Sequence, residues 1–384
     1  MIPIARPLLD EREVAAARRA ILSGWVSQGP EVAAFEREFA VGVGAPYACA
    51  VSSCTTALHL ALLVCGVGPG DEVVTVSHSF VATANAIRYC GAVPVFVDID
   101  LATFNMDTSQ LEAAITPRTK AILAVHQLGM PCDLASIVSV ARARGVLVVE
   151  DAACAAGSEI HLNGAWEPIG RPRGDIACFS FHPRKVLSTG DGGMLTTANE
   201  EFDRRFRLLR QHGMTVSDAV RHQSTQVTFE EYAVVGYNYR MTDIQGAIGR
   251  EQIKRLPGVV ARRRELAARY HDALRGHPTL KAPVEPAWAR SNWQSYAVRV
   301  PRGVQQSIMQ VLLDDGISTR RGVMNAHREP AYGPGTWRTA PGHRLDRSEE
   351  AQDTAVMLPL FHDLQESDQD RVIAALLRAS ATHS

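Results

Sequence analysis

Lys185 lies between two runs that are typical of buried strands, CFSF before it and GGMLTT after it. We expect this lysine at the end of a buried strand, where an ammonium group is costly unless something partners it. The side chain therefore either points to solvent, as a surface lysine in a turn, or is held close to a reaction that needs an amine.

A second group that could do chemistry is Asp151, which follows the apolar run VLVVE. This position is the expected carboxyl end of a strand, the edge at which open α/β sheets bind their ligands. A helix cap explains a single carboxylate there equally well. The small residues AACAAG that follow leave room for a flat group against the backbone.

A phosphate site is expected where the first strand meets a helix, in VSSCTTALHLAL. The helix is predicted to start after Ser53 and to carry Thr55 and Thr56 in its first turn. Free backbone N–H groups and the helix dipole favour an anion at such a terminus, although ordinary N-capping explains one junction of this kind. Ser180 adds a hydroxyl that can donate to a phosphate.

These groups together predict a site for pyridoxal 5′-phosphate (PLP). PLP needs a lysine amine for covalent attachment and an acid at its pyridine nitrogen, so that the protonated ring accepts electrons. An apolar or aromatic face against the ring is also expected, and Phe80 in SHSFVATANAI is placed to supply it.

Composition excludes several other classes of function. The 384 residues include 40 basic and 41 acidic side chains, so no basic face for nucleic acid is expected. The first residues lack the pattern of a signal peptide, and no apolar run reaches the ~20 residues that span a bilayer. The seven cysteines are scattered and never spaced CxxC, so we expect neither disulfides nor a metal site. The expected location is the cytoplasm, with no membrane partner.

Strands and helices alternate over the first part of the chain, which predicts an α/β fold with a buried, mostly parallel sheet. The expected strands cover residues 47–53, 71–77, 93–100, 120–127, 146–151, 176–182 and 192–197. A long helical region over residues 244–274, with an expected kink at Pro257, leads into a smaller α+β part. We therefore predict a large domain over residues 1–250 and a small domain over residues 251–384.

The ordered motifs resemble the DegT/DnrJ/EryC1/StrS family of PLP-dependent sugar aminotransferases. The resemblance runs through nearly the whole chain and is strongest in GWVSQGPEVAAFE, VSSCTTALHLALLVCGVGPGDEVVTVSHSFVATANAI, VHQLGMPCDL, EDAACAAG, FSFHPRKVLSTGDGGML and GYNYRMTDIQGAIG. The segment RRGVMNAHREPAY resembles the family's C-terminal substrate-side motif. Several ordered motifs are far more specific than one. The resemblance implies fold type I of the PLP-dependent transferases, with a mostly parallel seven-stranded sheet domain and a smaller C-terminal α+β domain.

The resemblance also assigns roles to individual residues. Lys185 matches the lysine that attaches PLP, and Asp151 matches the partner of the pyridine nitrogen. The other cofactor-binding positions that match are Cys54, Thr55, Thr56, Phe80, Cys154 and Ser180. Asn238 matches an asparagine that reaches the neighbouring subunit's phosphate, which implies a homodimer with shared active sites.

Three further residues are expected on the substrate side. His327 and Tyr332 match substrate-binding positions of the family. Arg320 lies close by in the sequence, where it could bind a phosphate of a sugar nucleotide or be an ordinary surface arginine.

Three positions depart from the family's usual residues. Cys54 stands where the family usually has glycine, and Cys154 stands where it commonly has a glutamine that contacts the PLP hydroxyl. Cysteine is shorter than glutamine, which puts that hydrogen bond in doubt. Asp191 replaces the commoner glutamate, which is a mild change.

The implied reaction moves an amino group from glutamate to a nucleotide-linked keto sugar. Lys185 would act as general base and acid, and we expect the cationic cofactor to lower its pKa. The motifs favour a 4-keto-6-deoxyhexose, as in perosamine-synthase-like members, and leave open a 3-keto sugar or a keto-inositol that yields an aminocyclitol. A non-catalytic PLP-binding regulator, a Rossmann-type oxidoreductase and an inactive paralogue are less consistent with these residues.

Overall fold

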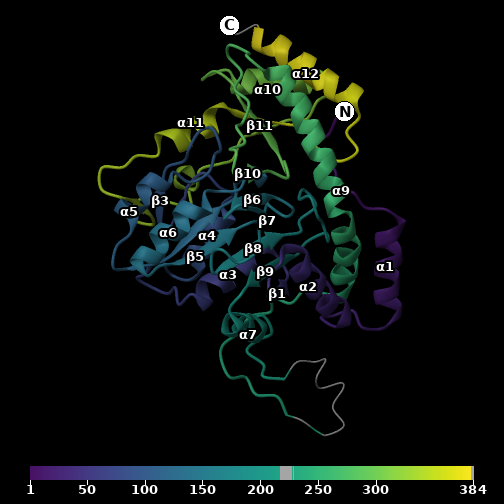
Figure 1. Ribbon diagram of the computed structural model, residues 1–384, viewed down its shortest axis with the longest axis vertical. Coiled ribbons are helices and arrows are strands. Elements are labelled where there is room, and N and C mark those ends of the chain that lie inside the picture. The colour runs from purple at the N-terminus through teal and green to yellow at the C-terminus, as the bar shows by residue number, and fades with distance from the viewer. Residues whose placement is uncertain (217–226, 228, 382–384) are drawn as a thin grey trace.

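An eight-stranded sheet crosses the larger part of the molecule in the computed structural model, which describes residues 1–216, 227 and 229–381 (Figure 1). The strand order is β1-β9-β8-β5-β4-β2-β3-β13. The strands are β1 (Tyr47–Val51), β2 (Glu72–Val76), β3 (Val93–Val97), β4 (Thr119–Val125), β5 (Leu147–Asp151), β8 (Ile176–Ser180), β9 (Gly193–Thr197) and β13 (Arg338–Thr339). Only β9 runs antiparallel to its neighbours, β1 and β8.

The prediction of a mostly parallel sheet is therefore confirmed. The seven predicted strands are all present, although several end one to three residues earlier than expected. The eighth strand, β13, comes from the C-terminal part of the chain and pairs parallel with β3 at the edge of the sheet. Two residues are too few to produce a recognisable alternation in the sequence.

Helices cover both faces of this sheet. Alternate residues of one strand enter different cores, as Val73 and Val74 of β2 do, because successive side chains point to opposite faces. One face packs against α3 (Cys54–Val64), α4 (Ala82–Tyr89) and α7 (Glu200–Leu209). The other packs against α2 (Pro30–Val43) and α6 (Leu134–Arg144), and the short α5 (Leu111–Ala114) lies between β3 and β4 in the chain.

The helix α9 (Asp243–Leu274) links the two parts of the molecule (Figure 1). Its first half packs against α1 (Glu11–Leu22) and α2, and its second half enters the core of the smaller part. The helix continues through Pro257, so this proline does not end it.

The smaller part is built on the sheet β11 (Tyr296–Arg299), β14 (Ala355–Leu358) and β12 (Arg320–Arg321). The helices α10 (Gln305–Asp314), α11 (Asp346–Thr354) and α12 (Glu366–Ala381) accompany it. A further sheet, which was not predicted, joins β6 (Glu159–Leu162), β7 (Ala165–Pro168) and β10 (Ala289–Arg290).

The chain crosses between the two parts more than once. Residue 250 lies inside α9, the N-terminal Ile2 belongs to the core of the smaller part, and β13 joins the large sheet. The division into residues 1–250 and 251–384 therefore stays a prediction. None of the helices in the described residues is long and apolar enough to cross a membrane.

Candidate functional site

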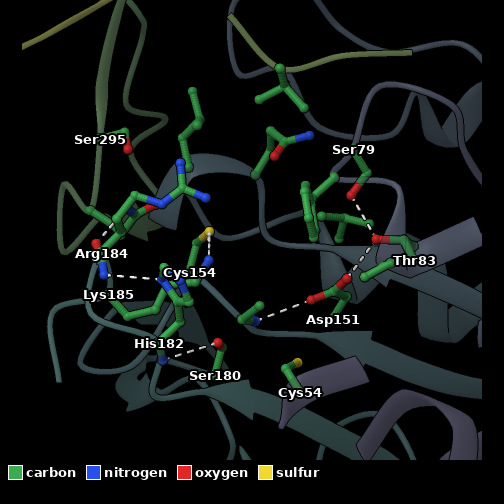
Figure 2. Close-up of a pocket in the computed structure, with 18 of the residues that line it drawn as sticks. Cys54, Ser79, Thr83, Asp151, Cys154, Ser180, His182, Arg184, Lys185 and Ser295 are labelled. Atoms are coloured by element: carbon green, nitrogen blue, oxygen red, sulfur yellow. Dashed lines mark hydrogen bonds between the residues drawn. The ribbon is translucent and has the colours of Figure 1, made fainter. Parts of the chain in front are cut away.

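A cavity of about 420 Å³ lies at the carboxyl ends of β1, β2, β4, β5 and β8. The smaller part of the molecule closes it with Gln294, Ser295 and residues 320–324. Asp151 ends β5, Cys154 follows in the turn after it, and Lys185 comes from the loop after β8, and all three face this one space (Figure 2). The cavity thus forms at the sheet edge where α/β proteins bind ligands.

Asp151 ends β5 and is held in place by two donors. Its Oδ2 accepts a hydrogen bond of 2.7 Å from Thr83 Oγ1, and its Oδ1 accepts one of 3.2 Å from the N–H of Ala153. The residue is buried yet lines the cavity. A fixed carboxylate with acceptor capacity left over can receive a donor from a ligand.

Lys185 does not lie at the end of a strand, contrary to the prediction. The strand β8 ends at Ser180, and Lys185 follows in the loop that leads to β9. Pro183 in this loop has no N–H to continue the ladder. The Lys185 amine Nζ donates to Cys154 Sγ at 3.0 Å, so the loop directs the side chain into the cavity (Figure 2).

The chain's own residues favour the charged form of Lys185. Burial lowers its pKa, but the sulfur of Cys154 and then the groups of Cys54 and Asp151 outweigh this effect, so the pKa lies above the ordinary value. The expected lowering of this pKa would therefore have to come from the positive charge of the cofactor itself.

The start of α3, where an anion site is expected, reaches the cavity with two of its three predicted residues. Thr55 and Cys54 line the cavity. Thr56 does not: its hydroxyl donates to the Ser53 carbonyl at 2.8 Å and accepts from the Ser53 N–H at 3.2 Å, so it caps the helix. Gly193 lets β9 approach this turn, because a Cβ there would lie 2.5 Å from the carbonyl carbon of Ser53.

Two further residues that are expected to bind the cofactor, Ser180 and Phe80, also reach the cavity. Ser180 lines it, and its Oγ accepts a 3.4 Å hydrogen bond from the N–H of His182. Phe80 lines it as well and is 63% exposed, which is unusual for a large apolar side chain. A ligand ring that covered Phe80 would remove this exposed apolar surface from water.

Asn238 is exposed and does not line the cavity of its own chain. Its neighbour Tyr239 accepts a backbone hydrogen bond of 2.8 Å from Ser52, next to the start of α3. The segment is thus attached to the chain next to the start of α3. The expected contact of Asn238 with a neighbouring subunit stays a prediction.

His327 and Tyr332 do not line the cavity either, and their expected role on the substrate side stays a prediction. His327 bonds Ser77 Oγ at 2.6 Å and Glu349 at 3.2 Å, and Tyr332 donates to Asn85 at 2.7 Å. Burial lowers the pKa of His327, and the Glu349 carboxylate offsets only part of this effect.

Three arginines line the cavity, Arg184, Arg320 and Arg321, and the sequence pointed only to Arg320. Arg320 comes from β12 of the smaller part and Arg184 from the loop before Lys185. Neither guanidinium forms an ion pair with a described residue. Partial burial and the charge of Arg320 lower the pKa of Arg184, which indicates that the two cations share one region.

A short segment of the smaller part connects the turns that carry Cys154 and Lys185. Asn292 is fully buried and donates to the carbonyls of Cys154 and Ala156, both at 2.8 Å. Gln294 donates to the carbonyl of Arg184 at 3.1 Å. Sequence reasoning missed both residues, because single polar side chains between strands carry no periodic signal.

The groups that face the cavity fit PLP. A helix start with hydroxyl groups suits the phosphate, Asp151 suits the pyridine nitrogen, and an amine and an exposed aromatic ring lie on the same cavity. No group of His, Cys, Asp and Glu in the described part of the chain could hold a metal ion.

Comparison with known proteins gives a consistent result. The DegT/DnrJ/EryC1/StrS aminotransferase family matches residues 7–377. The spore coat polysaccharide biosynthesis protein SpsC of Bacillus subtilis is 40% identical over 98% of this chain and 96% of its own length.

Solved structures agree with this match. The aminotransferase TlmJ of Streptoalloteichus hindustanus superposes with a TM-score of 0.90 at 37% identity, over 100% of both chains. Spr1654 of Streptococcus pneumoniae, solved in its PLP form, superposes with a TM-score of 0.89 at 28% identity, over 99% of both chains.

Proposed function

Since the chain belongs to the DegT/DnrJ/EryC1/StrS aminotransferase family, we propose that it transfers an amino group from glutamate to a nucleotide-linked keto sugar. As a PLP-dependent aminotransferase it needs one site for cofactor, donor and acceptor. The observation that carries the proposal is the meeting of Lys185, Asp151 and the start of α3 on one cavity.

The cofactor would be held at three points of this cavity. Thr55, Ser180 and the first N–H groups of α3 would bind the phosphate, and Asp151 would accept a hydrogen bond from the ring nitrogen. Phe80 would cover one face of the ring. Bound in this way, PLP supplies an electron sink for the negative charge that develops on the donor's Cα.

Lys185 would move the proton of the reaction. Its amine must lose its own proton before it can accept the one from the donor's Cα, and it later returns that proton. Cys154 lies 3.0 Å away and holds the amine in the cavity. Asp151 would accept the hydrogen bond of the ring nitrogen at the other side of the site.

The acceptor would enter past Arg184 and Arg320. These two cations come from different parts of the molecule and have no ion-pair partner among the described residues. Guanidinium groups bind phosphate oxygens through paired, charge-assisted hydrogen bonds. This pair therefore suits the diphosphate of a sugar nucleotide, while the sugar reaches the amine.

The sugar we favour is a 4-keto-6-deoxyhexose whose amino product enters a surface polysaccharide. This choice rests on the motifs of the sequence and on the similarity to SpsC, which is named for spore coat polysaccharide biosynthesis. The working unit would be a homodimer, in which Asn238 reaches the phosphate site of the neighbouring subunit.

Absorption spectroscopy of the purified protein tests this proposal. The protein should show the near-visible band of lysine-attached PLP, and glutamate should remove that band with release of 2-oxoglutarate. A panel of nucleotide-linked keto sugars should then restore the band when the acceptor is correct. A protein that PLP cannot reconstitute, or a coloured protein that ignores glutamate, would contradict the proposal.

A further inference from the structure

A chain of two hydroxyl groups ends on the carboxylate of Asp151. Thr83 Oγ1 lies 2.7 Å from Asp151 Oδ2, and Ser79 Oγ lies 2.7 Å from Thr83 Oγ1 (Figure 2). All three residues are buried, with exposed fractions of 4% for Ser79, 1% for Thr83 and 6% for Asp151. Neither hydroxyl group was among the residues to which the sequence pointed.

The direction of these hydrogen bonds follows from the acceptor at their end. Thr83 Oγ1 is the donor and Asp151 Oδ2 the acceptor, so the single proton of the Thr83 hydroxyl points to Asp151. The Thr83 oxygen is then left to accept the proton of Ser79. Donation therefore runs from Ser79 through Thr83 to Asp151, and each hydroxyl group is committed to one direction.

The carboxylate is fixed from both of its oxygens. Thr83 donates to Oδ2, and the N–H of Ala153 donates to Oδ1 at 3.2 Å. A carboxylate offers about four acceptor sites, so two such donors leave capacity for a ligand. Because Asp151 lines the cavity, this remaining capacity is open to the group that the cavity binds.

Thr83 is also tied to the residue proposed to cover the cofactor ring. The N–H of Thr83 donates to the carbonyl of Phe80 at 3.1 Å, so both residues belong to one turn at the start of α4. This turn carries the aromatic face and the support of the carboxylate together. A ring placed on Phe80 and a ring nitrogen placed at Asp151 are therefore positioned by a single local structure.

We propose that Thr83 is a positioning residue, which orients and charge-stabilises the Asp151 carboxylate for the ring nitrogen of PLP. The inference rests on the proposed function. Thr83 acts through Asp151 and needs no contact with the cofactor. Its effect should therefore depend on the ring nitrogen, because a ligand without that nitrogen gains nothing from a well-held carboxylate.

The experiment compares two ligands of the full-length protein from which PLP has been removed. One ligand is PLP, and the other is a PLP analogue in which a C–H group replaces the ring nitrogen. Thr83→Val keeps the shape and removes the donor, whereas Thr83→Ser keeps the donor. Dissociation constants for both ligands are measured by titration, together with the melting temperature of each protein before PLP is added.

Thr83→Val should bind PLP about tenfold more weakly, as expected for the loss of a hydrogen bond to a charged group, while its affinity for the analogue stays within about twofold. Thr83→Ser should bind both ligands like the wild type. If Thr83→Val lost affinity for both ligands equally, Thr83 would have a merely structural role and the inference would be overturned. Unchanged affinity for PLP would overturn it as well.

Two further outcomes are distinguishable. If Thr83→Val does not fold, Ser79→Ala can be used, because it removes the outer donor. This variant should also lose affinity for PLP more than for the analogue, by a smaller factor than Thr83→Val. Unchanged affinity for both ligands, or equal loss of affinity for both, would overturn the inference. If the wild-type protein itself does not bind PLP, the proposed function fails and the inference falls with it.

Discussion

The amine Nζ of Lys185 lies 3.0 Å from Sγ of Cys154, so a sulfur atom holds the group that the reaction needs. The two residues come from different turns, and Asn292 and Gln294 bind the backbone of both turns from the smaller part of the molecule. The position of this amine therefore depends on contacts between the two parts, and not on the Lys185 loop alone.

Lys185→Ala should abolish transamination. The variant loses the group that takes and returns the Cα proton, and the rate should fall by about a thousandfold or more. Rapid-quench measurement of 2-oxoglutarate from glutamate tests this expectation. Retained turnover in a variant that still folds, as judged by circular dichroism, would contradict the proposed mechanism.

Cys154→Ala should shift the pH dependence of PLP attachment to lower pH. The sulfur raises the pKa of Lys185 against the lowering effect of burial, so its removal lets this pKa fall. A lower pKa leaves more neutral amine at a given pH, and only the neutral amine can attack the PLP aldehyde. The test is the rate of PLP capture by the cofactor-free protein across a range of pH.

Cys65→Ala is the matched control for this experiment. Cys65 is also partly buried, but it lies at the end of α3 and outside the cavity. Its removal should leave the pH dependence of the rate of PLP capture unchanged. A Cys154→Ala profile that coincides with the wild type would mean that the sulfur does not act on Lys185.

Arg184→Ala and Arg320→Ala should each raise the KM for the nucleotide-linked sugar by about tenfold to a hundredfold, the loss expected for a hydrogen bond between charged groups. The half-reaction with glutamate should keep its rate. Separate kinetics of the two half-reactions measure this split. Arg378→Ala is the control, because Arg378 pairs with Asp315 on the surface.

A result in which the KM for glutamate rises instead would assign these arginines to the donor's carboxylate. The proposal that they bind the diphosphate of the acceptor would then be wrong, although the assignment of the cofactor site would stand.

Asn292→Ala should lower the free energy of unfolding by about 2–4 kcal/mol, because two buried carbonyl groups lose their donor. Urea unfolding of the cofactor-free protein measures this loss, and the affinity for PLP should fall with it. Gln310→Ala, on the exposed side of α10, should change stability by less than about 0.5 kcal/mol. Equal stability of the two variants would contradict the bridging role of Asn292.

The sheet and the residues at its edge were predictable because their signals are local. The strand β5 is an apolar run that ends at Asp151, and α3 starts at a Ser53 cap, so short stretches of sequence place both groups. Lys185 lines the cavity, but it was assigned to the wrong element. The strand before it ends at Ser180, where the ladder with β9 stops.

The residues that were missed act over long separations in the chain. Thr83 reaches Asp151 and Asn292 reaches Cys154, contacts that no pattern within a few residues encodes. His327 and Tyr332 were expected at the substrate, and this role stays a prediction; in the structure they bond Ser77 and Asn85 and do not line the cavity. A motif identifies a residue, but the fold decides which way its side chain points.

The most direct test of the central claim is to find where PLP attaches. The purified protein, loaded with PLP, is reduced with borohydride, digested and analysed by mass spectrometry. The account predicts a reduced pyridoxyl phosphate group on the peptide that contains Lys185, and its absence from Lys185→Ala. Attachment at another lysine, or no attachment at all, would contradict the assignment of this cavity as the active site.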